Sequence, residues 1–297
     1  MHIGQIKELW RYPVKSLGGE IIKDATLDEF GVIGDRCWSL INTQTGDVAW
    51  GKSHPGLMNL EARYVTEHPP GRVYTDGVPT VRIRFPDGDS VLSSDDASAK
   101  ISDFTKDNLQ LCPLEPPENR DHYRWQEPLD AEKIMAVLGV KPGERVPDLS
   151  SYDEDLIQVL GEYYAPPGTY NDMFPVHLVT SASVEHMEQV SGESFDRRRF
   201  RPNFYVETAS GIDGLAEFDW VGKYLAVGEA VLSVGAKTIR CSMPARAQAP
   251  YQLEQNSAIA KAIYQTTDRF FGVYLSVVTP GKVCEGDEVR LQDSPSA

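Results

Sequence analysis

The stretch that we expect to decide both fold and site is Thr238-Ile239-Arg240-Cys241-Ser242-Met243-Pro244. It follows a run rich in β-formers, Trp220 to Val234, and it places Cys241 next to an arginine just before a chain-breaking proline. A cysteine at a strand end has two interpretations. In most proteins it is a small buried hydrophobe, whereas among cations its thiolate is a nucleophile or a ligand for a soft metal. The rest of the sequence must decide between them.

Composition and charge exclude several classes of protein. The chain has 297 residues, of which 41% are hydrophobic and 25% charged, as in an ordinary globular protein with room for two domains or one large one. A formal net charge of −15 argues against a nucleic-acid partner, because phosphate contacts need a basic footprint. Neither an apolar run of about twenty residues nor a basic leader is visible. We therefore expect a cytoplasmic protein with no membrane partner or N-terminal anchor.

The cysteines point to a reducing compartment and to a lone thiol. Cys37, Cys112, Cys241 and Cys284 are widely spaced, with no C-x-x-C pair. This spacing excludes a cysteine-rich zinc or iron–sulfur site made by this chain alone, and it does not resemble a disulfide framework.

Two β-rich units flank a proline-rich middle. Residues 3–65 and 80–92 are typical of short strands with turns between them. Between residues 115 and 169, many prolines separate short predicted helices at Ala131–Leu138 and Asp153–Tyr164. We predict a mixed α+β, β-rich fold with units at 1–114, 115–169 and 170–297.

The last unit should be barrel-like, because it has many short strands separated by glycine turns. Its strands begin near Phe174, and the longest run covers Trp220–Cys241. Helices are expected at Ser181–Val190 and Ser257–Phe271, the second with its apolar residues on one face.

Several polar stretches could bind an anion. Lys15 and Ser16 lie in a turn after the first strand, and Arg36 lies between a turn and a strand. They would offer an ammonium, a hydroxyl and a guanidinium to one ligand. The alternatives are an exposed turn lysine and an arginine paired with Asp35.

Hydroxyl groups cluster where the strand before residue 180 becomes a helix. Thr180, Ser181 and Ser183 would add donors to the free N–H groups and positive dipole of the helix N-terminus, which is a natural phosphate site. Simple capping of the helix is the alternative.

The Arg197–Asn203 run is a dense cationic island in an acidic chain. We expect Arg201 and Asn203 to point inward and Arg197 and Arg198 outward. Arginine forks bind phosphate with two parallel hydrogen bonds. Together these stretches predict an anion pocket made from both halves of the chain with one thiol near it, but they name neither the anion nor a metal.

At this point the motifs resemble a known family. Tyr12–Ser16 and Gly34–Trp38 look like the N-terminal β-barrel domain that precedes MOSC domains. Further segments resemble the MOSC domain itself: His177–Ser183, Arg199–Asn203, Arg240–Cys241, Phe271–Tyr274, and Gly281 with Gly286–Asp287. The resemblance spans nearly the whole chain in order. The nearest chemistry is that of the mitochondrial amidoxime reducing component and its bacterial relatives.

This resemblance implies a molybdenum cofactor in a cleft between the two barrel-like units, with Cys241 as both metal ligand and catalytic residue. It also implies two-electron reduction of a small N-oxygenated substrate to an amine, with electrons from an external ferredoxin- or flavin-type protein. The residues implied to hold the pterin and its phosphate are Lys15, Ser16, Arg36, Thr180, Ser181, Ser183, Arg201, Asn203, Arg240 and Tyr274.

The sequence departs from the family at two places. Ser181 stands where amidoxime reducers often have Asp, and Ser-Met-Pro-Ala follows Cys241 in place of a Thr-rich run. We expect no ferredoxin-like domain after the last predicted strand, so a reductase would need a separate electron donor. The alternatives are a persulfide or sulfur carrier that uses Cys241, and a binding protein without turnover.

Overall fold

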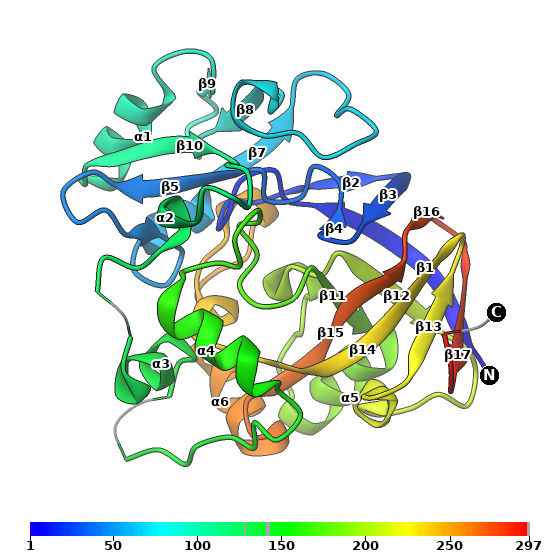
Figure 1. Cartoon of the computed structure of the whole chain (residues 1–297). Coiled ribbons are helices and arrows are strands. Elements are labelled where there is room, and N and C mark those ends of the chain that lie inside the picture. The colour runs from blue at the N-terminus through cyan, green and yellow to red at the C-terminus, as the bar shows by residue number, and fades with distance from the viewer. Residues whose placement is uncertain (128, 141–142, 296–297) are drawn as a thin grey trace.

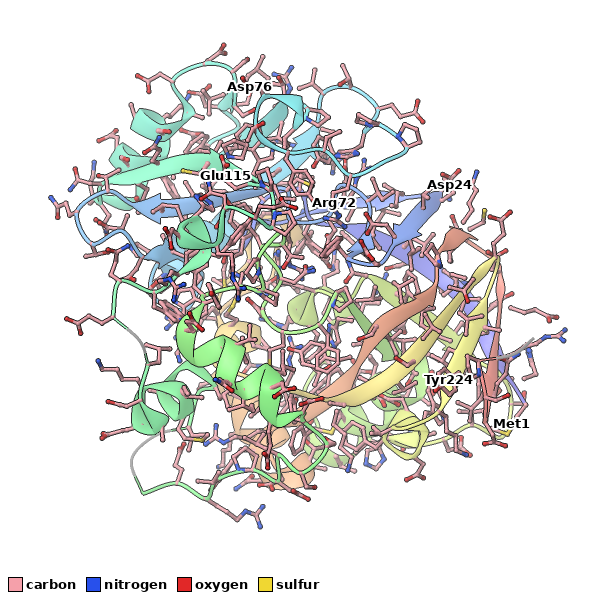
Figure 2. The ribbon with its side chains drawn as sticks, viewed as in Figure 1. Met1, Asp24, Arg72, Asp76, Glu115 and Tyr224 are labelled. Atoms are coloured by element: carbon pink, nitrogen blue, oxygen red, sulfur yellow. The ribbon has the colours of Figure 1, made fainter. Side chains whose placement is uncertain are left out.

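The structure is a computed structural model that describes residues 1–127, 129–140 and 143–295. A barrel occupies one side of the molecule, and small sheets with a helical segment occupy the other (Figure 1). Figure 2 shows Met1 and Tyr224 on the barrel side, and Arg72 and Asp24 on the side of the small sheets. The predicted mixed, β-rich fold is confirmed.

The barrel closes because its first and last strands in space pair with each other. The order β12-β11-β15-β14-β13-β17-β1 returns to β12, and β2 extends the sheet from β1. Only the β11–β12 pairing is parallel; the other pairings in the ring are antiparallel. The strands are β1 (His2–Arg11), β2 (Glu20–Ile22), β11 (Val176–Thr180), β12 (Phe204–Thr208), β13 (Tyr224–Val227), β14 (Ala230–Ile239), β15 (Phe270–Thr279) and β17 (Glu288–Gln292).

Alternating burial explains why these residues form a barrel. In β14 and β17 nearly every second side chain points inward, where Leu232, Val234 and Val289 join one buried cluster with Ile3 and Ile6 of β1. The N-terminal strand therefore completes a core built mainly from the last third of the chain. The predicted unit boundaries stay a prediction.

Two of the three small sheets and helix α1 build a second core, whereas the remaining small sheet, β16-β3-β4, packs its buried side chains into the barrel core. The sheets have the orders β10-β5-β6, β16-β3-β4 and β7-β8-β9, and the second borrows β16 from the C-terminal part of the chain. The elements are β3 (Asp24–Asp28), β4 (Gly31–Val32), β5 (Trp38–Asn42), β6 (Val48–Ala49), β7 (Glu61–Tyr64), β8 (Val81–Arg84), β9 (Ser90–Leu92), α1 (Ala97–Thr105), β10 (Leu109–Pro113) and β16 (Gly281–Cys284).

The middle of the chain packs against both parts. Tyr123 and Tyr164 join a cluster with Cys37 and Val48, while Leu138 joins a cluster with residues of β14 and β15. None of the helices in the described part of the chain is long and apolar enough to cross a membrane. The remaining α-helices are α2 (Arg120–Tyr123), α3 (Ala131–Val137), α4 (Glu154–Glu162), α5 (Ser181–Ser191) and α6 (Ser257–Thr267).

Two predicted boundaries are wrong. The helix predicted at Ser257–Phe271 ends at Thr267, because Asp268 and Arg269 adopt left-handed φ angles of 53° and 77° and turn the chain into β15. The predicted strand run from Trp220 also begins later: Ala216–Trp220 is a 3-10 helix, whose tryptophan packs into the barrel core.

Gly272 provides a direct test of this packing. Its φ is +78°, and a Cβ would lie 2.6 Å from both His177 Nε2 and Leu178 O. We expect Gly272→Ala to lower the free energy of unfolding by about 2–4 kcal/mol, from backbone strain plus overpacking.

Gly286 is a matched control, because its φ is +90° but nothing lies within 4 Å of its Cβ position. Gly286→Ala should cost about 1–2 kcal/mol. Urea unfolding measures both, and an equal loss would contradict the packing.

Candidate functional site

One cavity collects side chains from the N-terminal loops, the middle segment and the barrel. Lys15 follows β1, Asn203 directly precedes β12, and Cys241 lies just after β14. The starts and ends of barrel strands thus supply much of its lining. Most of the predicted site residues line it: Lys15, Ser16, Arg36, Arg201, Asn203, Arg240, Cys241 and Tyr274.

The cavity is strongly cationic although the chain is acidic. Six basic side chains and one carboxylate line it, which leaves an excess of five positive charges in a chain of net charge −15. Arginine keeps its proton in proteins, so most of this charge cannot be removed by burial. The charged lining residues are Lys15, Arg36, Lys52, Arg199, Arg201, Arg240 and Asp172. Such a lining fits an anionic ligand.

The carboxylate sits against Lys15. The Lys15 ammonium is buried and donates to Tyr170 O at 2.8 Å and to Asp172 Oδ1 at 2.5 Å. Burial lowers the pKa of Lys15, and Asp172 opposes this shift. The Asp172 side chain is 58% exposed; desolvation would raise its pKa, but Lys15 and Arg36 hold it at about 2. Asp172 is therefore ionised at neutral pH and offsets part of the cationic charge.

Several buried donors in the cavity lack acceptors among the described residues. They are Arg201 Nη2, Arg199 Nε, Arg240 Nε and, as a donor or acceptor, His177 Nε2. Arg201 Nη1 donates to Leu17 O, and its guanidinium lies 4.2 Å from the centroid of the Tyr12 ring. A buried donor that makes no hydrogen bond lowers the stability of the folded protein by about 1–3 kcal/mol. Unpaired donors in a cationic cavity indicate where a ligand's oxygen atoms would bind.

Three of the lining residues adopt unusual backbone conformations. Ser16, Arg36 and Arg201 have φ angles of 71°, 48° and 54°. A left-handed conformation costs a non-glycine residue about 1–2 kcal/mol, and such strain gathers at functional sites. At Arg36 the pairing with Asp35 helps to hold the turn, so the alternative anticipated for this arginine is also present. Ser16 Oγ accepts from Gly51 N at 2.9 Å.

Cys241 is the only cysteine among the described lining residues. It is half-buried, and the loop after α3 packs on it so closely that a Cβ at Gly139 would lie 3.0 Å from Cys241 Cα. Burial raises the pKa of Cys37 and Cys112 to about 11, and neither thiol is among the described residues that line the cavity. Cys241 is thus the thiol that a ligand in the cavity can reach.

Thr180, Ser181 and Ser183, the hydroxyls expected to form a phosphate site at the start of α5, are not among the described residues that line the cavity. Thr180 Oγ1 accepts from Ser183 N at 3.1 Å and donates to the buried Glu217 at 3.0 Å. Ser183 Oγ also donates to Glu217, and Ser181 Oγ bonds Thr208 Oγ1 at 2.9 Å. Burial raises the pKa of Glu217. These hydroxyls cap the helix and satisfy a buried acid.

Asn203 and Tyr274 have structural partners as well as cavity exposure. Asn203 Oδ1 accepts from His177 N at 3.1 Å, and its Nδ2 donates to Trp10 O at 3.3 Å, so its amide ties β11 to β1. The Tyr274 ring stacks on Phe174 with centroids 5.1 Å apart. Arg197 and Arg198, expected outside, are half-exposed and pair with Glu8 and Asp196.

Several residues that line the cavity were not predicted from the sequence. Asp172 stands alone as an acid in an aromatic stretch, Tyr170–Phe174, and that isolation is the signal that could have found it. Lys52 carries no comparable signal. Arg199 was within the predicted island, and its guanidinium donates to three backbone carbonyls, those of Pro244, Arg246 and Glu254.

Comparison with known families agrees with this arrangement. The model for the MOSC domain matches residues 166–290, and the model for the MOSC N-terminal beta barrel domain matches residues 3–110. The chain is therefore a MOSC-domain protein that carries the MOSC N-terminal beta barrel domain.

Relatives with longer matches are distant. Mitochondrial amidoxime-reducing component 1 of Mus musculus is 24% identical over 323 residues, which cover 97% of this chain and 82% of the relative. Mitochondrial amidoxime reducing component 2 of Rattus norvegicus is 22% identical over 318 residues, covering 98% and 84%. Among solved structures, the YuaD protein from Bacillus subtilis superposes with a TM-score of 0.43 at 12% identity, covering 98% of this chain and 97% of that one. YiiM from Geobacillus stearothermophilus gives 0.30 at 23% identity, covering 40% and 54%.

The Lys15–Asp172 pair predicts a pH dependence. The folded-state pKa of Asp172 is about 2, below the ordinary 3.8, so the pair stabilises the fold above pH 4 and this contribution is lost as the pH falls toward 2. We expect Asp172→Asn to lower the free energy of unfolding most near neutral pH, with the difference from the native chain shrinking in acid. Denaturant unfolding across a pH series measures this. A difference that does not change with pH would contradict the ion pair.

Proposed function

We propose that the cavity binds a molybdenum cofactor and that the protein reduces N-hydroxylated compounds to amines. The observation that carries this proposal is the set of unpaired buried donors and excess cations beside a single accessible thiol. Two relatives whose names describe amidoxime reduction support it.

The cations and the thiol that line the cavity are of the kinds that would bind the cofactor's phosphate and its metal. Lys15, Ser16, Arg36, Arg201 and Arg240 would hold its phosphate and pterin, with Asn203 and Tyr274 shaping the wall that it meets. Cys241 would supply a thiolate to the metal. In the described part of the chain, no three His, Cys, Asp or Glu side chains gather as a metal site. A metal that arrives with its own organic ligand needs only one protein thiolate, which agrees with this donor set.

When bound, the cofactor would supply the two-electron chemistry, and the protein would position it. The overall reaction breaks an N–O bond and forms an N–H bond, consumes two electrons and two protons, and releases water. The electrons would come from a separate redox protein of the ferredoxin or flavin type. The residues of this chain would hold the anion, limit the access of water and orient the N-hydroxyl group. The cations and the strained turns that carry them are already in position before any ligand binds.

The expected result of replacing Cys241 with Ala is loss of the metal without loss of the fold. In protein made by a host that synthesises the cofactor, molybdenum content and reduction of benzamidoxime under a chemical reductant should both fall at least about 100-fold. The free energy of unfolding should change by less than about 1 kcal/mol, because the side chain is only half-buried. Cys284→Ala is the matched control, since Cys284 lies on β16 outside the described cavity lining.

Other outcomes distinguish the alternatives. Full activity in Cys241→Ala would sink the reductase proposal. Bound pterin without turnover would favour a binding protein. A mass increase of about 32 Da on Cys241 would instead favour a persulfide carrier.

A further inference from the structure

One wall of the cavity is apolar, and most of its residues come from a part of the sequence that, among the described residues, contributes none of the cavity's cations. The described lining residues between the two family matches, which end at 110 and resume at 166, are all uncharged. Together with Trp50, they form what we call the aromatic wall: Trp125, Leu138, Leu160, Tyr163 and Tyr164. A ligand part that lies against this wall meets ring and aliphatic surface.

Hydrogen bonds within the protein engage the Trp125 indole and the hydroxyls of Tyr163 and Tyr164 in the aromatic wall. Trp125 Nε1 donates to Leu160 O at 2.9 Å, and the Tyr164 hydroxyl donates to His122 O at 2.5 Å. The Tyr163 hydroxyl accepts from Arg120 Nε at 3.0 Å. Because these hydrogen bonds engage the Trp125 indole and both tyrosine hydroxyls, what this part of the wall offers to a ligand is mainly apolar contact.

The aromatic wall is also held in place before a ligand binds. Trp125 N donates to Glu162 O at 3.0 Å, and Tyr164 N donates to Tyr123 O at 2.9 Å. The Trp125 ring meets Trp50 and Tyr164 edge to face, with centroids 5.7 and 5.9 Å apart. A buried, cross-braced aromatic surface loses little entropy when a flat ring docks on it.

We propose that the aromatic wall makes the protein select N-hydroxylated substrates whose body is a flat, uncharged aromatic ring over those with a short aliphatic body. This inference rests on the proposed reductase function and names the substrate class of the same site. The N–O bond broken and the electrons and protons consumed are those given above. Trp125 and Trp50 act here as specificity-determining residues, because they contact the body of the substrate and not its reacting atoms.

The first test compares two substrates on the full-length, cofactor-loaded protein. The ratio of kcat/KM for benzamidoxime to that for acetamidoxime should fall at least about tenfold in Trp125→Leu, which keeps apolar bulk but removes the ring. Gln158→Ala, at an exposed position on α4, the helix that carries the wall residue Leu160, should leave the ratio unchanged. Trp50→Leu, at a half-buried position, serves as the second variant if Trp125→Leu does not fold.

The second test needs no turnover and separates this inference from the reductase proposal. Calorimetry without an electron donor should give tighter binding of benzamidoxime than of acetamidoxime, by about tenfold or more, and the preference should be lost in the wall variants. Selective binding in a protein that reduces neither compound would support the aromatic wall while overturning the reductase proposal. Equal affinities for the two compounds, or a preference that survives both wall variants, would overturn the inference.

Discussion

The rest of the site depends on buried positive charge that the protein itself neutralises only in part. Two like charges 4 Å apart repel by about 4 kcal/mol at an effective dielectric constant of 20, and burial adds a desolvation cost. This acidic chain nevertheless gathers six cations around one cavity and gives them a single carboxylate there. Desolvation lowers the pKa of the guanidinium of Arg201, which is buried, and of Arg240, which is half-buried. A fold tolerates such an arrangement when a bound anion repays it.

The closed barrel is what brings these cations together. The turn that carries Lys15 follows β1, the Arg201–Asn203 segment precedes β12, and the Arg240–Cys241 pair follows β14. The pairing of Leu9 with Phe204 fixes the first two segments side by side, and the Asn203 amide braces them through Trp10 and His177. Closure of the barrel thus sets the distances among groups that lie far apart in the sequence (Figure 1).

Much of this could be predicted from local patterns, and the rest depends on long-range contacts. Alternation and glycine turns predict the strands, and the mixture of arginine, proline and asparagine after residue 196 predicts an inward-facing cation. The start of α5 shows the limit: a sequence reveals hydroxyls at a helix N-terminus, but not that Glu217, more than thirty residues later, accepts from Thr180 and Ser183. The aromatic wall was equally hidden, because Trp125 and Tyr164 meet only when the middle segment folds back on itself.

The measurement that tests the central claim most directly is a crystal structure of the protein purified with its natural ligand from a host that makes molybdenum cofactor. Our account predicts a phosphate within hydrogen-bonding distance of Arg201 Nη2, which has no acceptor among the described residues, and a metal bound to Cys241 Sγ. A phosphate at the N-terminus of α5, bonded to Ser181 or Ser183, with Cys241 unligated, would contradict it.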